Sequence, residues 1–96
     1  MTNRNNIYSE IEAERERQDI KWGGADHDDT HQSHDWISYI VRHVGRAIMW
    51  PFDPALFCKQ MIRVAALAVA AVEWSVRRDT RTAAKAGVDV AGHRLP

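Results

Sequence analysis

Residues 64–72 read VAALAVAAV, and this stretch decides the fold. A helix with such a centre is apolar all round, so it must be covered on most of its sides. Its alanines let the backbones of neighbouring helices approach closely. Asp53 followed by Pro54 is an N-cap residue before a proline at the first helical position, which predicts a helix from 54 to about 78.

A second helix is predicted over residues 34–49. Its apolar side chains follow a clean helical spacing from Trp36 to Ile48, which is typical of a helix with one buried face. Either Thr30 or Ser33 is expected to cap its N-terminus.

A third helix is predicted over residues 5–20, N-terminal to both. This segment is rich in Glu, Arg and Ala, which favour helices, but it has only a thin apolar stripe, so we expect it to be peripheral. Gly23-Gly24 ends it, because paired glycines allow a tight turn.

The chain of 96 residues has room for a single domain. We therefore expect an all-α fold, with residues 1–78 forming a three-helix hairpin or bundle and residues 79–96 forming a basic, flexible tail. Three helices cannot enclose the apolar helix at 64–72, so we expect self-association into a dimer or tetramer to complete the bundle.

The charges are balanced overall but divided along the chain. The sequence has 13 basic and 13 acidic residues. Residues 1–35 carry nine acids and four bases, and residues 36–96 carry nine bases and four acids. Either the two halves pack against each other, or the basic half binds an anion. The zero net charge argues against nucleic acid as a general partner.

The sequence favours a reducing cytoplasm. Cys58 is the only cysteine, so no disulfide can form within one chain, and we expect this thiol to be buried like a small apolar side chain. The N-terminal residues lack the apolar core of a signal peptide. The longest apolar run, 64–72, is shorter than the roughly 20 residues of a membrane span, so no membrane is expected as a partner.

Two segments carry a family resemblance. The first reads ERERQDIKWG from Glu14 to Gly23, and the second is VAALAVAAV at 64–72. Together they resemble the small MazG-like proteins of bacteriophages and prophages, which belong to the all-α nucleotide pyrophosphohydrolase superfamily. The resemblance covers roughly residues 7–78. It implies a helical bundle that dimerises or tetramerises in the cytoplasm of the bacterial host.

The resemblance also implies a reaction, but the chain departs from its pattern. Enzymes of this family cleave nucleoside triphosphates to the monophosphate and pyrophosphate, with Mg²⁺ held by an ExxE and an ExxD pair on two helices. The corresponding positions here are His43, Arg46, Gln60 and Arg63. None of them is a carboxylate, the ligand that Mg²⁺ prefers. An enzyme is therefore not the favoured reading.

These residues suggest an anion pocket, since arginine forks suit phosphate oxygens. Lys21 could meet a further phosphate and Trp22 could stack on a base. The candidate anion- or nucleotide-binding residues are Lys21, Trp22, His43, Arg46, Gln60 and Arg63. The alternative is that the cations pair with the glutamates of the 5–20 helix or face solvent, and that Trp22 closes the end of the bundle.

The polar segment between the first two helices is dense in Asp and His. Its weak candidates for a Zn²⁺ or other transition-metal site are His27, His31, His34 and Asp35. If a Mg²⁺-dependent activity survives, its relocated ligands would be Glu12, Glu16, Asp28 and Asp29. The alternative is a polar loop whose side chains cap turns.

Three functional hypotheses follow. The first is a degenerate MazG-like binding protein of phage origin that acts by protein contact, for example by inhibiting a host defence or regulatory factor. The second is a Mg²⁺-dependent nucleoside triphosphate pyrophosphohydrolase with relocated ligands. The third is a metal-free nucleotide-binding sponge.

Overall fold

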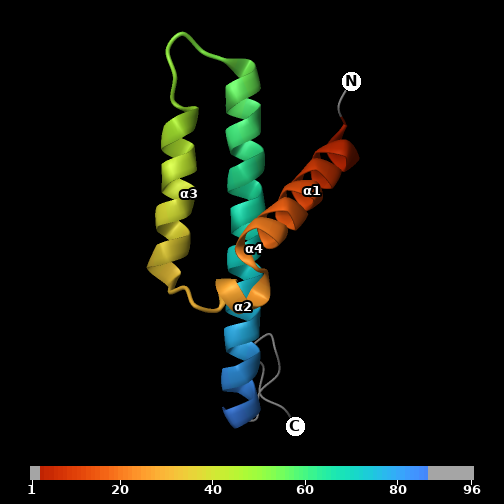
Figure 1. The fold of residues 1–96 in the computed structure, drawn as a ribbon, viewed down its shortest axis with the longest axis vertical. Helices are drawn as coiled ribbons and strands as arrows, with labels where there is room; N and C mark the ends of the chain where they lie inside the picture. Colours follow the sequence, from red (N-terminus) through yellow and green to blue (C-terminus); the bar gives the residue numbers. More distant parts are fainter. Residues whose placement is uncertain (1–2, 87–96) are drawn as a thin grey trace.

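The computed structural model describes residues 3–86, with side chains through Thr80. Its helices are α1 (Arg4–Trp22), α2 (Ala25–Asp28), α3 (Ser33–Ala47) and α4 (Pro54–Ala86) (Figure 1). No strand occurs within the described range, so the all-α prediction is confirmed there.

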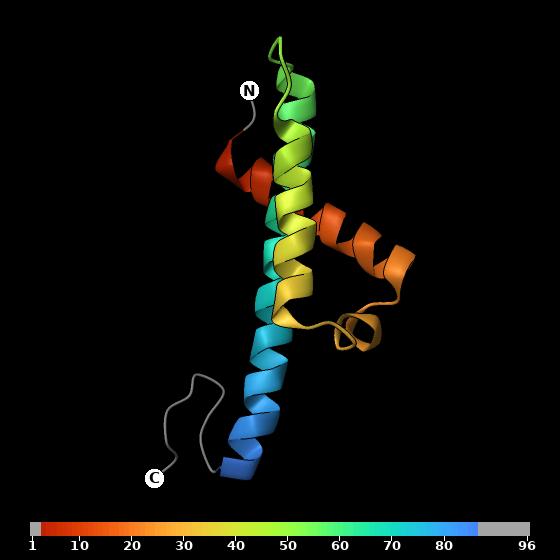
Figure 2. The same ribbon diagram turned by 90° about the vertical axis from the view of Figure 1, so that its left-hand side faces the viewer.

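Helices α3 and α4 form an antiparallel hairpin, and α1 crosses α4 obliquely (Figure 2). The short helix α2 joins α1 to α3 and also contacts α4. Among the residues whose side chains are described, the buried apolar ones are few: Trp36, Ala66 and Ala70. The two alanines come from the central apolar stretch, where their small side chains permit close packing between helices. As predicted, α1 is peripheral, because none of its residues is buried.

Helix α4 begins where the sequence predicts. The backbone N–H of Leu56 donates to the Asp53 side-chain Oδ1 at 3.1 Å, so Asp53 is the N-cap and Pro54 the first helical residue. The helix ends at Ala86 rather than near 78. The expected tail at 79–96 therefore starts too early, and its last ten residues, 87–96, lie outside the described residues.

The same helix is long and apolar enough, over Pro54–Thr80, to cross a membrane by length and composition alone. Only 17 % of its most apolar window is buried within the chain. Most of this window is therefore not fully buried by the described residues of one chain.

The segment before α3 differs from its prediction. Residues 25–28 form the helical turn α2 instead of a loop. The N-cap of α3 is Gln32, neither Thr30 nor Ser33, and the Gln32 backbone N–H donates to the Asp35 carboxylate at 2.7 Å. Gln32 and Asp35 together form a capping box. Such a pair gives hydrogen-bond partners to backbone N–H groups that have none at the start of a helix.

Cys58 is exposed on α4, so the expectation of a buried thiol is wrong.

Gly23 ends α1 in a left-handed conformation, with φ of 99°, and its N–H donates to the Asp19 carbonyl at 2.8 Å. We expect Gly23→Ala to lower the free energy of unfolding by about 1 kcal/mol, because a Cβ disfavours this backbone. Gly45 is the control: it lies inside α3 with open space around it, so Gly45→Ala should raise stability by about 0.5–1 kcal/mol. Urea unfolding measures both, and two changes of the same sign would contradict this interpretation.

Candidate functional site

A cleft of about 390 Å³ lies between the C-terminal half of α1, helix α2 and the α3–α4 hairpin. That volume is in the range of small-molecule sites. Its cationic lining consists of Arg15, Arg17, Lys21, Arg42, Arg46 and Arg63. Its aromatic lining consists of Trp22, His27, His31, Trp36 and Tyr39. The acidic residues that line it are Glu14 and Asp28.

One end of the cleft carries arginines without acidic partners. Arg42 and Arg46 are four residues apart on α3, so they share a face, and Arg63 approaches from α4. Among the described residues, none of these three forms an ion pair. Their guanidinium groups are therefore free to bind an anion in the cleft.

His43 and Gln60 join α3 to α4 behind these arginines. The Nδ1 of His43 lies 2.8 Å from the Oε1 of Gln60. A carbonyl oxygen only accepts hydrogen bonds, so this contact assigns the proton to Nδ1. Gln60 is buried and does not line the cleft, whereas His43 does.

The other end of the cleft is aromatic. The ring of Trp22 is about half exposed and stacks on His27 at 6.0 Å between centroids, with 20° between the planes. His27 meets His31 edge-on at 4.9 Å, and His31 lies 5.4 Å from Tyr39. The Lys21 ammonium lies 4.9 Å from the centroid of the Trp22 ring. This end offers flat rings for stacking, with one cation beside them.

Asp28 is a buried carboxylate in the lining of the cleft, with 9 % of the residue exposed. Its Oδ2 lies 3.9 Å from an Arg15 guanidinium nitrogen. Within the described part of the chain, no donor forms a hydrogen bond with its side chain. Burial raises the pKa of Asp28, while Arg15 opposes that rise.

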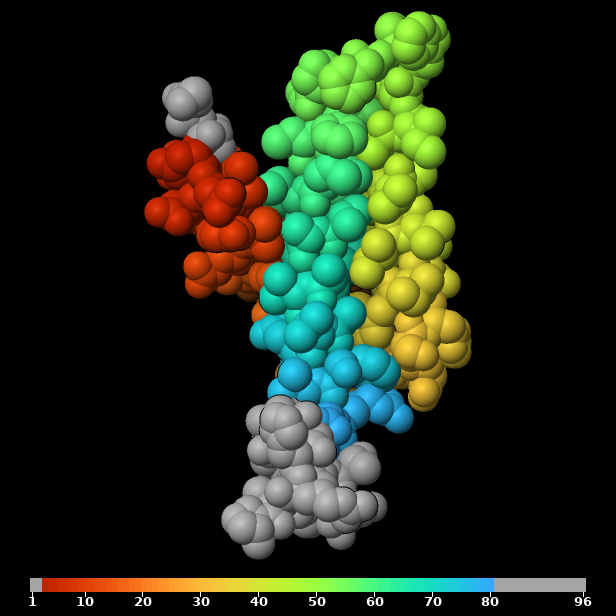
Figure 3. All heavy atoms as spheres, turned by 180° about the vertical axis from the view of Figure 1, so that it is seen from behind, coloured from red at the N-terminus to blue at the C-terminus, as the bar shows by residue number. Residues whose placement is uncertain are grey.

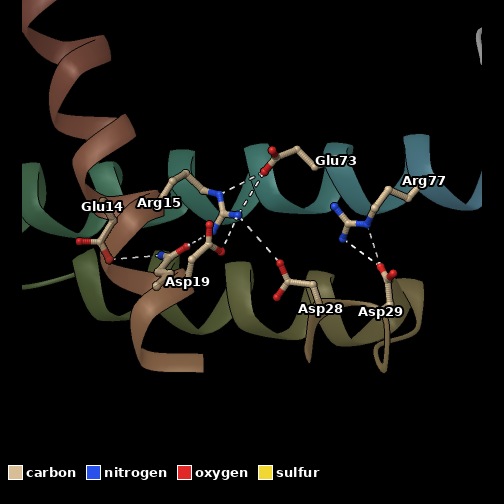
Figure 4. A network of polar contacts seen from close by, with 8 residues as sticks. Glu14, Arg15, Asp19, Asp28, Asp29, Glu73 and Arg77 are labelled. Carbon is tan, nitrogen blue, oxygen red and sulfur yellow. Dashed lines mark hydrogen bonds and ion pairs between the residues drawn. The ribbon is translucent and has the colours of Figure 1, made fainter. Parts of the chain in front are cut away.

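A charged network holds α1 and α2 against α4 and fixes the walls of the cleft (Figure 4). The Arg15 guanidinium contacts Asp19 at 3.0 Å and Glu73 at 3.1 Å. Arg77 of α4 contacts Asp29 at 2.9 Å. Of these pairs only Asp29–Arg77 joins an acid of the N-terminal half to a base of the C-terminal half; Arg15–Asp19 lies within the N-terminal half, and Arg15–Glu73 has the opposite polarity.

The metal candidates are placed apart. His27 and His31 line the cleft, whereas His34 is exposed and its Nε2 lies 3.7 Å from Asp35. No group of three His, Cys, Asp or Glu side chains that could hold a metal ion occurs in the described residues. A loop site built from His27, His31, His34 and Asp35 therefore lacks the geometry that it needs.

The four carboxylates considered for a relocated Mg²⁺ site are also divided. Glu12 and Glu16 line a separate, shallower groove of about 440 Å³ between α1 and α4. Asp28 lines the main cleft, and Asp29 is paired with Arg77.

The positions that correspond to the family's Mg²⁺ ligands do not fit that ion either. Arg46 and Arg63 present two positive charges, and His43 is bonded to Gln60. Mg²⁺ takes oxygen ligands, mostly carboxylates and water, so this donor set suits an anion and not a cation.

Comparison with family models, with curated proteins and with solved structures found no match to this chain. The class of protein is therefore defined by its fold and its candidate site alone. The described residues form an all-α protein with a cleft that is cationic at one end and aromatic at the other.

The structure brings five of the six sequence-predicted anion-binding residues to one cleft; the exception, Gln60, supports His43 from behind. Sequence reasoning missed Tyr39 and Arg42 as lining residues. Tyr39 lies seven residues and Arg42 four residues before Arg46. This helical spacing already places both on the same face of the helix as Arg46. The burial of Asp28 had no signal in the sequence, because it depends on how α2 folds against α4.

Replacing Asp28 is expected to stabilise the fold at neutral pH. Because the pKa of Asp28 is raised above its ordinary value of 3.8, the folded chain retains a proton that the unfolded chain releases. Stability is therefore lost as the pH rises through the raised pKa. Asp28→Asn removes this loss, so it should raise the free energy of unfolding at pH 7.

The pH dependence checks the sign of this effect. Arg15 and Asp19 of α1, Arg77 of α4 and His31 all act on Asp28. The gap in unfolding free energy between Asp28→Asn and the unaltered chain should close below about pH 4. A gap that widens in acid would show that the ionised carboxylate stabilises the fold.

Proposed function

We propose that this chain is a metal-independent nucleotide-binding protein on a MazG-like all-α scaffold. The single observation that carries the proposal is the polarity of the cleft, with unpaired arginines at one end and stacked rings at the other. A nucleotide has the same polarity, since anionic phosphates are joined through a sugar to a flat base.

The dimensions of the cleft agree with such a ligand. Tyr39 and Arg46 are seven residues apart on α3, which separates them by about 10 Å along the helix axis. A base stacked near Trp22 and His27 would then direct its phosphates toward Arg42, Arg46 and Arg63. Arginine forks can hold phosphate oxygens bidentately without a metal.

Binding without hydrolysis is the expected behaviour. In the resembled enzymes Mg²⁺ neutralises the phosphates and activates water. Here Arg46 and Arg63 supply the neutralising charge, but a guanidinium cannot accept a proton from water. A sponge that holds a nucleotide therefore agrees with the cleft better than a pyrophosphohydrolase does.

Calorimetric titration of nucleoside mono-, di- and triphosphates tests this proposal, in EDTA and again with Mg²⁺. We expect binding in EDTA that Mg²⁺ does not strengthen, and no release of pyrophosphate. The absence of binding to every nucleotide, or Mg²⁺-dependent pyrophosphate release at enzymatic rates, would overturn it.

A second candidate function, action by protein contact, is favoured by an exposed apolar surface. This apolar face consists of Ile37, Val41 and Val44 on α3, Ile48 at the C-cap of that helix, and Val72 and Val76 on α4. Each of these side chains is at least 41 % exposed. Seen from behind, α3 and α4 lie side by side and α1 emerges beside α4, so α1 does not cover this side of the hairpin (Figure 3).

The apolar face lies opposite the cleft. At about 100° per residue, the apolar stripe of α3 is about 160° around the helix from Tyr39, Arg42 and Arg46. On α4, Val72 is likewise turned away from Arg63. We assign this face to a second copy of the chain, because both stripes repeat at the three- and four-residue spacing of helical bundles. A host protein of the infected cell is the alternative occupant.

The origin and the cellular location proposed with this function are the ones that the family resemblance implies. They are a phage or prophage gene and the cytoplasm of the bacterial host. The experiment that tests self-association also tests whether α4 crosses a membrane. A chain whose apolar face is covered by a second copy should stay in solution without detergent.

A further inference from the structure

We infer that the cleft is matched to a nucleoside diphosphate, and that Arg46 is the residue that recognises the second phosphate. The inference rests on the proposed function. It adds to that function the length of the phosphate chain and the side chain that distinguishes one length from another.

The first step is the amount of positive charge that the cleft leaves without a counterion. Six Lys or Arg side chains line the cleft. Two arginines of α1 are paired with acids, and the lysine near the end of α1 lies over a tryptophan ring. The remaining three, Arg42, Arg46 and Arg63, form no ion pair within the described residues. One end of the cleft therefore carries three unmatched guanidinium groups.

A single phosphate does not balance this charge. A phosphate monoester carries about −1.5 to −2 at pH 7, whereas all three guanidinium groups stay protonated. Arg42 and Arg46 are also four residues apart on one helix, and like charges at that spacing repel each other. A second phosphate supplies the missing negative charge and reduces this repulsion. The charge of the site therefore favours a nucleoside diphosphate over a monophosphate.

The second step is the order of the three arginines along the cleft. The Nδ1 of His43 lies 2.8 Å from the Oε1 of Gln60, so these two residues are level in the antiparallel hairpin. Arg46 is three residues after His43, which places it about 4.5 Å nearer the α3–α4 loop. Arg63 is three residues after Gln60 on the opposite strand of the hairpin, so it is about 4.5 Å farther from that loop. The two backbone positions are therefore about 9 Å apart along the hairpin, with Arg42 between them.

This order assigns different phosphates to different arginines. Tyr39 lies three residues before Arg42 on α3, so the aromatic end of the cleft is on the side of Arg63 and away from Arg46. The phosphate next to the sugar is then within reach of Arg42 and Arg63. Arg46 is the farthest of the three from the base, so it receives the second phosphate.

The cleft ends at Arg46 on the side of the loop. None of residues 47–62, all of which the structure describes, lines it. A third phosphate would extend past Arg46 into solvent and would meet no further cation of the lining. The site therefore has a partner for the second phosphate and none for the third.

The experiment compares the mono-, di- and triphosphates of adenosine and of guanosine, and inorganic pyrophosphate, by calorimetry in EDTA. Each diphosphate should bind about 10-fold or more tightly than the monophosphate of the same base, the worth of one hydrogen bond to a charged group. Each triphosphate should differ from its diphosphate by less than that factor. Pyrophosphate should bind more weakly than either diphosphate, because it has no base to stack. These titrations use the unaltered protein and do not depend on any variant folding.

Arg46→Gln supplies the second measurement. It removes the charge that the second phosphate meets, so it should weaken binding of the diphosphate about 10-fold more than binding of the monophosphate. Arg63→Gln should weaken both and keep their ratio. Lys59→Gln is the matched control for net charge, since Lys59 is exposed on α4 and does not line the cleft; it should leave the ratio unchanged.

The outcomes separate this inference from the proposed function. If no nucleotide binds, or if pyrophosphate binds as tightly as the diphosphates, the proposed function fails. Monophosphates that bind as tightly as diphosphates, or triphosphates that bind 10-fold or more tightly than diphosphates, would leave nucleotide binding intact and overturn the match to two phosphates. A preference for diphosphates that Arg46→Gln leaves unchanged would overturn the role of Arg46.

Discussion

Arg63→Glu is expected to reduce nucleotide affinity by about 100-fold or more. Arg63 is the cation that α4 contributes to the cleft, and it forms no ion pair among the described residues. Loss of a charge-assisted contact accounts for about 10- to 100-fold, and the new carboxylate adds repulsion against the phosphates. Calorimetry in EDTA measures the change.

Two further variants make this result specific. Arg63→Lys keeps the charge but loses the planar fork, so its affinity should fall between those of the unaltered chain and Arg63→Glu. Arg78→Glu changes the net charge by the same amount on the same helix, but Arg78 stacks on Trp74 outside the cleft. If Arg78→Glu weakens binding as much as Arg63→Glu, the ligand responds to the overall charge and not to a site.

The second large effect concerns the apolar face. We expect Val41→Arg to dissociate the assembly into single chains and to lower the melting temperature by about 10 °C or more. Val41 is 61 % exposed in one chain, so the substitution should cost little inside a chain, but in the assembly it would bury an unpaired charge. Since the buried apolar core of one chain is small, its folding should depend on association.

Sedimentation velocity at several protein concentrations measures this effect. Ser38→Arg is the control, because Ser38 is exposed on α3 about one turn away and outside the apolar face. It should leave the assembly intact. A chain that is monomeric and stable without substitution, or that needs detergent to stay in solution, would show that no second copy covers this face.

The fold was predictable where local chemistry and apolar spacing agree. Asp53-Pro54 fixed the start of α4, and Gly23 fixed the end of α1. The end of α4 was misplaced because the apolar pattern stops near 78 while good helix formers continue to Ala86. Helix propensity, strongest in the alanines and Lys85 of residues 83–86, extends the helix past the end of the apolar pattern.

The positive charges of the candidate site were predictable from the sequence, but the burial of its residues was not. Replacement of carboxylates by Arg46 and Arg63 is visible in the sequence once the helices are aligned with the resembled pattern. The burial of Asp28 is a tertiary effect: it requires the turn at Gly23-Gly24, the helical turn α2, and the Arg15 and Arg77 contacts that hold α1 and α2 on α4. No spacing rule along the chain contains that information.

The cleft and the apolar face lie on opposite sides of the chain, and this arrangement determines how many ligands an assembly of two chains can bind. Two chains joined through their apolar faces would direct their clefts outward on opposite sides, with both hairpins between them. Each cleft would then load its own ligand, and no short polyphosphate could bridge the two. Saturation at one ligand per chain with a Hill coefficient near one is the behaviour of such a back-to-back pair, which suits a protein that lowers the free concentration of its ligand in proportion to its own abundance.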